Sequence, residues 1–155
     1  MGTTYEKDVV AWAQEQAQLL RSGQLSALDI EHIAEEIEDV GKEQKVALQS
    51  HFRQILIHLL KLNYSPAQDP RDGWIEEIFE FRAQAESRIE DVPSLKHYAD
   101  ELFARAWPQA RRAAVNALER YRESAEIPDE CPYTIDQVMD SDFLPEQGEK
   151  YQLRC

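Results

Sequence analysis

The chain has 155 residues, 43% of them hydrophobic, and a formal net charge of −13 from 30 acidic and 17 basic side chains. This hydrophobic content excludes a wholly disordered chain, and the charge argues against a general affinity for nucleic acid or an anionic membrane. No segment approaches the ~20 apolar residues of a membrane span, and no secretory signal opens the chain. The two cysteines make no disulfide framework, so we expect a cytoplasmic protein.

Helix-forming residues dominate the sequence and only five glycines interrupt it, which favours an all-α fold. The first periodic segment runs from Thr4 to Ser22, where apolar side chains recur at helical spacing. Thr3 or Thr4 can cap its start and Gly23 can end it.

A second helix is expected over about residues 27–63, because Ser26 to Asp29 has the pattern of a capping box. Its apolar residues share one stripe about 120° wide on a helical projection. These residues are Ile30, Ile33, Ile37, Val40, Leu48, Phe52, Ile55, Leu59 and Leu62. The stripe keeps its phase through Gly41, which favours one continuous helix that is kinked or closely approached there. The alternative is that one helix ends at Gly41 and another begins at Lys42.

Two further long helices are expected after a loop at residues 63–70. The third helix continues to about Asp91, and Ser94 can cap a fourth that contains Pro108. Residues 124–155 hold eight acids and two bases, and Thr134 can begin a short helix that ends near Met139.

Short connections before Ser26 and Ser94 favour antiparallel neighbouring helices. We therefore predict an all-α, antiparallel up-down bundle of four long helices, with a short C-terminal helix and an irregular acidic tail. Residues 1–146 are expected to form a single helical domain and residues 147–155 a disordered C-terminus. Within that domain the tail, residues 124–146, packs back on the bundle through apolar anchors, with its acids near Arg105 and Arg112.

The segment from Asp29 to Gly41, DIEHIAEEIEDVG, resembles the D-x-x-x-LAEEIEDLG signature of a bacterial family known as domain of unknown function 29. The resemblance covers roughly residues 5–146. It includes Trp12, Gln16, Leu19 to Arg21, His58 to Lys61, Trp74, Arg82, Pro93 to Leu95, Cys131 to Tyr133 and Asp142 to Glu146. It departs at Gly73, where the family pattern has Ser, and at Trp107, where it has Tyr. The resemblance implies a helical, bacterial, cytoplasmic protein and implies no activity.

The histidines are candidate ligands for the kinds of metal site found in helical bundles. A di-iron centre needs Glu-x-x-His motifs, and the sequence has none. His51 and His58 are seven residues apart and so lie on one side of the second helix. With a third ligand such as His97 or Glu101 they could hold a divalent metal with an open position. The alternative is that both histidines lie at the edge of the core and bond across a helix interface.

Charged residues supply the other candidate sites. Acids including Glu35 and Glu38 form two stripes on the second helix, which could be ligands, general bases, a docking face or an ordinary solvated surface. The segment from Ala104 to Arg122 is the one basic patch in the sequence. Its Arg105 and Arg112 could bind an anionic ligand or the chain's own acidic tail.

Nothing in the sequence resembles a nucleophile elbow, a phosphate-binding loop or a dinucleotide fingerprint. We therefore expect a non-enzymatic protein-binding or regulatory module that needs no cofactor, with another protein or a second copy as its partner. The alternative is a metal-dependent hydrolase-like bundle that uses His51, His58 and a carboxylate.

Overall fold

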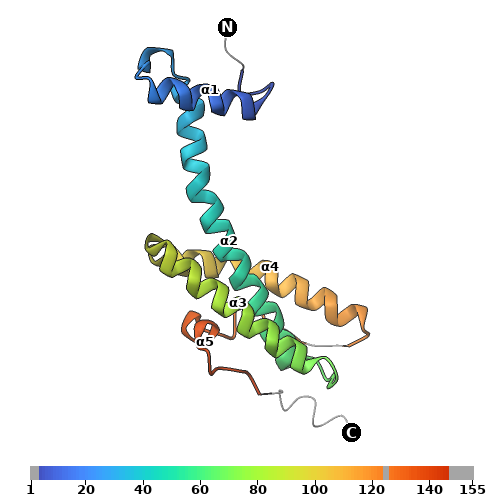
Figure 1. Ribbon diagram of the computed structural model, residues 1–155. Coiled ribbons are helices and arrows are strands. Elements are labelled where there is room, and N and C mark those ends of the chain that lie inside the picture. The colour runs from blue at the N-terminus through green and yellow to red at the C-terminus, as the bar shows by residue number, and fades with distance from the viewer. Residues whose placement is uncertain (1–3, 124–125, 147–155) are drawn as a thin grey trace. The chain divides into compact units, whose positions relative to one another are not determined.

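The computed structural model describes residues 4–123 and 126–146, and this part of the chain is helical (Figure 1). Its α-helices are α1 (Val9–Arg21), α2 (Ile30–Tyr64), α3 (Arg71–Asp91), α4 (Ala99–Arg120) and α5 (Ile135–Met139), and its 3₁₀ segments are η1 (Leu25–Ala27) and η2 (Pro93–His97). The all-α class is confirmed, with four long helices and a short fifth. Within the described ranges, no helix is both long and apolar enough to cross a bilayer.

The chain forms two compact units, an N-terminal unit of residues 1–43 and a C-terminal unit of residues 44–155. The single domain expected over residues 1–146 stays a prediction. Residues 147–155, for which the sequence predicts disorder, lie outside the described residues.

The boundaries of α1 are set by local hydrogen bonds. The helix begins at Val9 rather than near Thr4, because the Asp8 carboxylate accepts the backbone N–H of Ala11 at 3.0 Å. Its last residue is Arg21, and Gly23 terminates it as predicted, with a φ of 75° that suits a residue without a side chain. The backbone N–H of Gln24 then reaches back to the carbonyl of Leu19 at 2.9 Å and closes the helix end.

The predicted start of α2 was too early. Residues 25–27 form η1 instead, and Asp29 caps the helix by accepting the backbone N–H of His32 at 3.4 Å. From there α2 continues without interruption through Gly41, which confirms the prediction of one helix. Of the two alternatives at Gly41, a kink or a close approach by another helix, the close approach is wrong, since a Cβ built there meets no atom within 4 Å.

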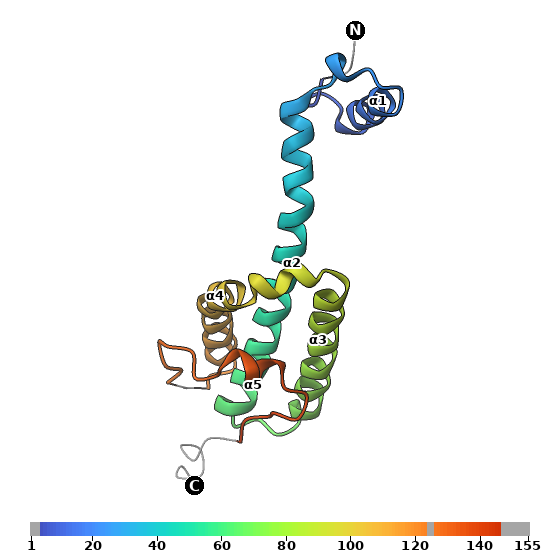
Figure 2. The same cartoon turned by 90° about the vertical axis from the view of Figure 1, so that its left-hand side faces the viewer.

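The core of the C-terminal unit surrounds the last four turns of α2. Leu48, Phe52, Ile55 and Leu59 are fully buried there. In Figure 2, α3 and α4 lie on opposite sides of this part of α2, and α5 crosses in front of it. The residues that α3 and α4 bury in the same core are Ile78, Ala85, Leu102, Ala106, Trp107, Ala110, Ala114 and Leu118.

The connection between α3 and α4 differs from the prediction. Pro93 to His97 forms η2, so α4 begins at Ala99 and Ser94 does not cap it. Pro108 lies inside α4, as its position in the periodic segment predicted.

Within the C-terminal unit, residues 126–146 pack on α2, α3 and α4. Ile127, Tyr133 and Val138 are buried in its core, and Phe143 and Leu144 are partly buried against it. The capping box at the start of α5 is formed, with Thr134 and Gln137 bonded to each other's backbone. The tail is therefore anchored by apolar side chains on both sides of α5.

Candidate functional site

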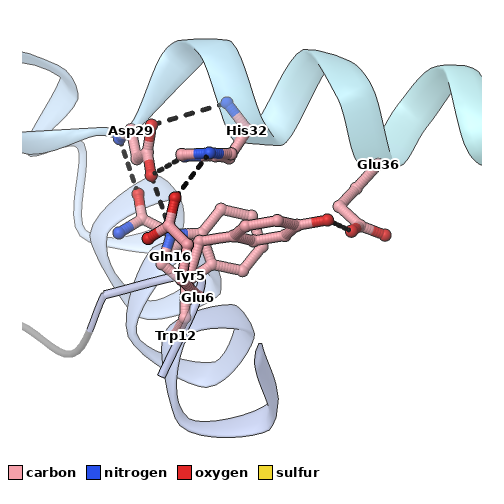
Figure 3. A network of polar contacts seen from close by, with 7 residues as sticks. All are labelled: Tyr5, Glu6, Trp12, Gln16, Asp29, His32 and Glu36. Atoms are coloured by element: carbon pink, nitrogen blue, oxygen red, sulfur yellow. Dashed lines mark hydrogen bonds and ion pairs between the residues drawn. The ribbon is translucent and has the colours of Figure 1, made fainter. Parts of the chain in front are cut away.

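Seven side chains of the N-terminal unit form a hydrogen-bonded group, here called the polar cluster (Figure 3). Its members are Tyr5, Glu6, Trp12, Gln16, Asp29, His32 and Glu36. They come from the segment before α1, from α1 itself and from the first turns of α2. The cluster thus connects the beginning of the chain to the beginning of α2.

Asp29 is the centre of the polar cluster. Its carboxylate accepts the indole N–H of Trp12 at 3.0 Å, and its backbone N–H donates to the Gln16 side chain at 2.8 Å. Trp12 and Gln16 are both buried on the inner face of α1. The residue that caps α2 therefore also determines where α1 packs.

His32 lies between two carboxylates. Its Nδ1 is 2.7 Å from Asp29 and its Nε2 is 3.4 Å from Glu6, and its ring stacks on Tyr5 with centroids 4.2 Å apart. The hydrogen bond to Asp29 raises the pKa of His32, and the same bond lowers the pKa of Asp29. With both ring nitrogens directed at carboxylates, the imidazole is suited to act as a charged donor that holds residues 5 and 6 on α2.

Tyr5 completes the cluster. Its hydroxyl donates to Glu36 at 2.5 Å, which raises the pKa of Tyr5 to about 12, and its ring meets Trp12 edge to face. The phenol therefore stays protonated and keeps its donor at physiological pH. Sequence analysis identified several of these residues in the family pattern but did not predict that they bond to one another.

A second feature of the N-terminal unit is exposed apolar surface. Eleven large apolar side chains are exposed among the described residues, and seven belong to this unit: Val9, Val10, Leu20, Leu25, Ile30, Ile37 and Val40. Three of them lie on α2, where Ile30 and Ile37 are each 68% exposed and Val40 is 62% exposed. With the half-buried Ile33, they form the α2 stripe.

The predicted site residues Glu35 and Glu38 are both exposed on α2. At 100° per residue, Glu38 and Glu31 follow one edge of the α2 stripe, and Glu36 and Glu43 follow the other. Glu35 lies on the opposite side of the helix, 200° from Ile37. The structure therefore places Glu38 at the border of an apolar surface and Glu35 away from it.

The predicted metal ligands His51 and His58 lie on either side of Phe81, with ring centroids 6.3 and 6.1 Å from it. His58 Nδ1 is 2.7 Å from the Gln54 carbonyl, and Nε2 is 3.5 Å from Glu77. Burial lowers the pKa of both histidines. Across residues 4–123 and 126–146, no group of three or more His, Cys, Asp or Glu side chains could hold a metal ion.

The predicted arginines do not contact the tail in the expected way. Arg105 is exposed and pairs with Glu101 one turn earlier at 2.6 Å, and Arg112 is exposed at a hollow of about 370 Å³. Arg111 contacts the tail instead, donating to the carbonyls of Ile127 at 3.0 Å and Pro128 at 2.9 Å.

Arg82 is a tail contact that the sequence analysis missed. Its guanidinium is buried and donates to the carbonyls of Val138 at 2.7 Å, Gln137 at 3.2 Å and Phe143 at 2.8 Å. The guanidinium therefore donates hydrogen bonds to backbone carbonyls at the C-terminal end of α5, which lack partners within the helix. The sequence feature that could have identified Arg82 is its helical spacing from Ile78 and Ala85, which are buried on the same face of α3.

The comparisons with known proteins agree with this fold. The family model described as "Domain of unknown function DUF29" matches residues 4–144, so the chain belongs to this family. The crystal structure of an α-helical protein of unknown function from Rhodospirillum rubrum is similar, with a TM-score of 0.64 and 29% sequence identity. The match covers 92% of this chain and 93% of that one. No match was found among curated proteins.

Proposed function

We propose that this chain is a non-enzymatic protein-binding or regulatory module of the bacterial cytoplasm, and that the α2 stripe is its binding surface. The observation that carries the proposal is the exposure of Ile30, Ile37 and Val40 in a row on one side of one helix. Contiguous apolar surface of this kind, bordered by charged residues, is typical of protein interaction sites.

The choice of residue types supports the same conclusion. Ile and Val are β-branched and lose side-chain freedom in a helix, so they contribute less to an exposed helix than Ala, Lys or Glu would. Ile30, Ile37 and Val40 therefore contribute little to the stability of the isolated helix, and their apolar side chains are unfavourable in water. Burial against a partner would offset both costs, at about 25 cal/mol per Å² of apolar surface removed from water.

The polar cluster stabilises the first turns of α2, which carry this surface. It anchors α1 to Asp29 and residues 5 and 6 to His32 and Glu36, all near the beginning of the α2 stripe. A surface on a braced helix loses less conformational entropy on binding than one on a free helix.

The test is affinity purification of the tagged full-length protein from its own host, followed by mass spectrometry. Ile37→Ser removes the centre of the α2 stripe, while Val46→Ser is the matched control. Both residues are on α2 and are similarly exposed, at 68% and 66%, but nine residues separate them and place them on opposite sides of the helix. We expect a protein that co-purifies with the wild type and with Val46→Ser, and that is lost with Ile37→Ser. Retention of every co-purifying protein by Ile37→Ser would contradict the proposal.

A further inference from the structure

We propose that the α2 stripe binds a basic amphipathic helix of another protein. This inference rests on the proposed function and specifies the partner's shape and charge. It is carried by the geometry of the stripe and by the acids on both of its edges.

The shape of the stripe favours a helical partner. The backbone of α2 is hydrogen-bonded within the helix, so no free donors or acceptors are presented to an extended strand. Ile30, Ile33, Ile37 and Val40 follow a 3-4-3 spacing, which is the spacing of side-chain ridges that pack into the grooves of a second helix. From Ile30 to Gly41 the surface is about 16 Å long at ~1.5 Å per residue, enough for two to three turns of a partner.

Gly41 adds room for close approach. On the helical projection it lies within the stripe, beside Ile30 and Ile37. A Cβ built on Gly41 meets nothing within 4 Å, so the protein itself does not fill this space. A small residue in a helix interface lets the partner's backbone come near. The glycine is thus explained by a partner helix more readily than by any contact within the N-terminal unit.

The charge of the unit selects a basic partner. Residues 1–43 hold ten acids and three bases, a net charge of −7 on 43 residues. The C-terminal unit carries −6 on 112 residues, all of it from residues 124–155, so of the two units the N-terminal one has the higher charge per residue. Among the described residues, the acids at the edges of the stripe (Glu31, Glu36, Glu38 and Glu43) form no ion pair, although Glu36 accepts a hydrogen bond from the Tyr5 hydroxyl. A partner with Lys or Arg beside its apolar face would complement both edges at once.

The same charge disfavours a second copy of this chain. A symmetric dimer through the α2 stripe would bring −7 against −7, with acids facing one another along the interface. Lys42 is the one Lys or Arg of α2 within the N-terminal unit, and it lies 3.6 Å from Asp39 of its own chain, while the His32 ring is held by Asp29 and Glu6. Like charges directly opposed at an interface suppress association. We therefore assign the surface to a different, basic chain.

The test measures binding of fluorescent peptides to the full-length protein by anisotropy. The probe is a Leu/Lys amphipathic peptide of about 18 residues, long enough to span the surface as a helix. Its two comparison peptides are one with Glu in place of Lys and one of the same composition in scrambled order. We expect the basic amphipathic peptide to bind at least about tenfold tighter than either, and to weaken as salt is raised.

Variants locate the binding on the stripe. Ile37→Ser should weaken binding of the basic peptide by about tenfold, because the apolar anchor is lost. The double variant Glu31→Gln/Glu38→Gln should weaken it a few-fold and reduce its salt dependence. Val46→Ser should leave the affinity unchanged. A loss that is the same in Val46→Ser and Ile37→Ser would show non-specific attraction and overturn the inference.

The remaining outcomes separate this inference from the proposed function. Equal binding of the Lys and Glu peptides, lost in Ile37→Ser, would overturn the charge selection while leaving a protein-binding surface. If none of the three peptides binds, the proposal of a helical partner is wrong, and the co-purification experiment still tests the proposed function. A dimer in sedimentation that Ile37→Ser dissociates would show that the occupant is a second copy and overturn the inference.

Discussion

The two halves of α2 carry the same apolar period but meet different surroundings. In the N-terminal unit, Ile30 and Ile37 are each 68% exposed, whereas Phe52 and Ile55 in the C-terminal unit are fully buried. The second half packs against α3, α4 and the tail, whereas in the N-terminal unit α1 lies beside the beginning of α2 (Figures 1 and 2). A regular apolar stripe therefore determines that a segment is helical, and the supply of other elements determines whether its apolar side is buried.

Residue composition around the stripe distinguishes the two halves. Residues 29–43 contain seven acids and one base, so the apolar residues there form a narrow band on an otherwise charged helix. Residues 48–62 contain no acid, and apolar residues outside the stripe, such as Leu56 and Leu60, are fully buried too. A helix that is apolar nearly all round is a core helix, while one with a narrow band has one side for one partner.

The strongest test of this comparison is truncation of one apolar residue in each half. Phe52→Ala should lower the free energy of unfolding by about 3–5 kcal/mol, because it leaves a cavity in a closely packed core. Ile37→Ala should change it by less than about 0.5 kcal/mol, because an exposed side chain leaves no cavity. Urea denaturation of both variants measures the difference. A loss of several kcal/mol in Ile37→Ala would mean that the stripe is covered in the free protein.

The next largest effect concerns the tail that covers the second half of α2. Arg82→Met keeps the apolar stem and removes the guanidinium, which leaves the carbonyls of Val138 and Phe143 without their donor. We expect a loss of about 2–3 kcal/mol, since unsatisfied buried polar groups are costly. Limited proteolysis should cut residues 126–146 faster than in the wild type.

The matched control for Arg82→Met is Arg105→Met, which removes an exposed arginine that pairs with Glu101. An exposed pair of this kind contributes about 0–1 kcal/mol, so stability and tail cleavage should be nearly unchanged. An equal rate of tail cleavage in Arg82→Met and wild type would show that the apolar anchors hold the tail without the arginine.

Much of the fold follows from periodicity and local signals. The continuity of α2 through Gly41, the end of α1 at Gly23 and the capping box at Thr134 were all predicted, because each depends on residues close together in sequence. The start of α2 was placed too early because Ser26 and Asp29 fit a capping box. Asp29 instead caps the helix alone and bonds to Trp12, which is distant in sequence.

The contacts between distant residues were harder to predict. Arg82 and Arg111 contact the tail, whereas the sequence analysis expected Arg105 and Arg112. Charge alone could not choose among these arginines, since the deciding factor is the direction of each side chain from its helix. Glu35 and Glu38 were both identified as candidates, but only Glu38 borders the apolar surface of α2, whose exposure only the three-dimensional structure reveals.

A smaller effect is expected at Gly41, between the two halves. Gly41→Ala should raise the free energy of unfolding by about 0.8–1 kcal/mol, because alanine favours the helix and the added Cβ meets nothing within 4 Å. Gly41→Leu should also be tolerated, because no described part of the chain fills the space beside Gly41. Thermal melting of both variants measures this. A clear fall in melting temperature for Gly41→Leu would mean that a neighbour packs on Gly41 in solution.

The smallest expected effect is the pH dependence of the polar cluster in the N-terminal unit. The pKa of His32 is raised above its ordinary value of 6.5, so its contribution is complete below pH 6.5 and is lost as pH rises through the raised pKa. The pKa of Asp29 is lowered below 3.8, so its contribution holds above pH 3.8 and is lost as pH falls through the lowered pKa. The His32–Asp29 contact should therefore stabilise the unit most between these two ordinary values.

Hydrogen exchange of residues 4–21 at two pH values tests this window, after correction for the intrinsic rate. Protection should fall between about pH 5.5 and about pH 8.5, because the imidazolium that holds Asp29 and Glu6 loses its proton as pH rises through the raised pKa of His32. His32→Gln keeps a polar side chain but cannot take up the proton, so it should abolish the difference. Residues 48–62 serve as the internal control, since their core contains no part of the cluster and should exchange alike at both values. An unchanged pH dependence in His32→Gln would show that another group controls the opening of the N-terminal unit.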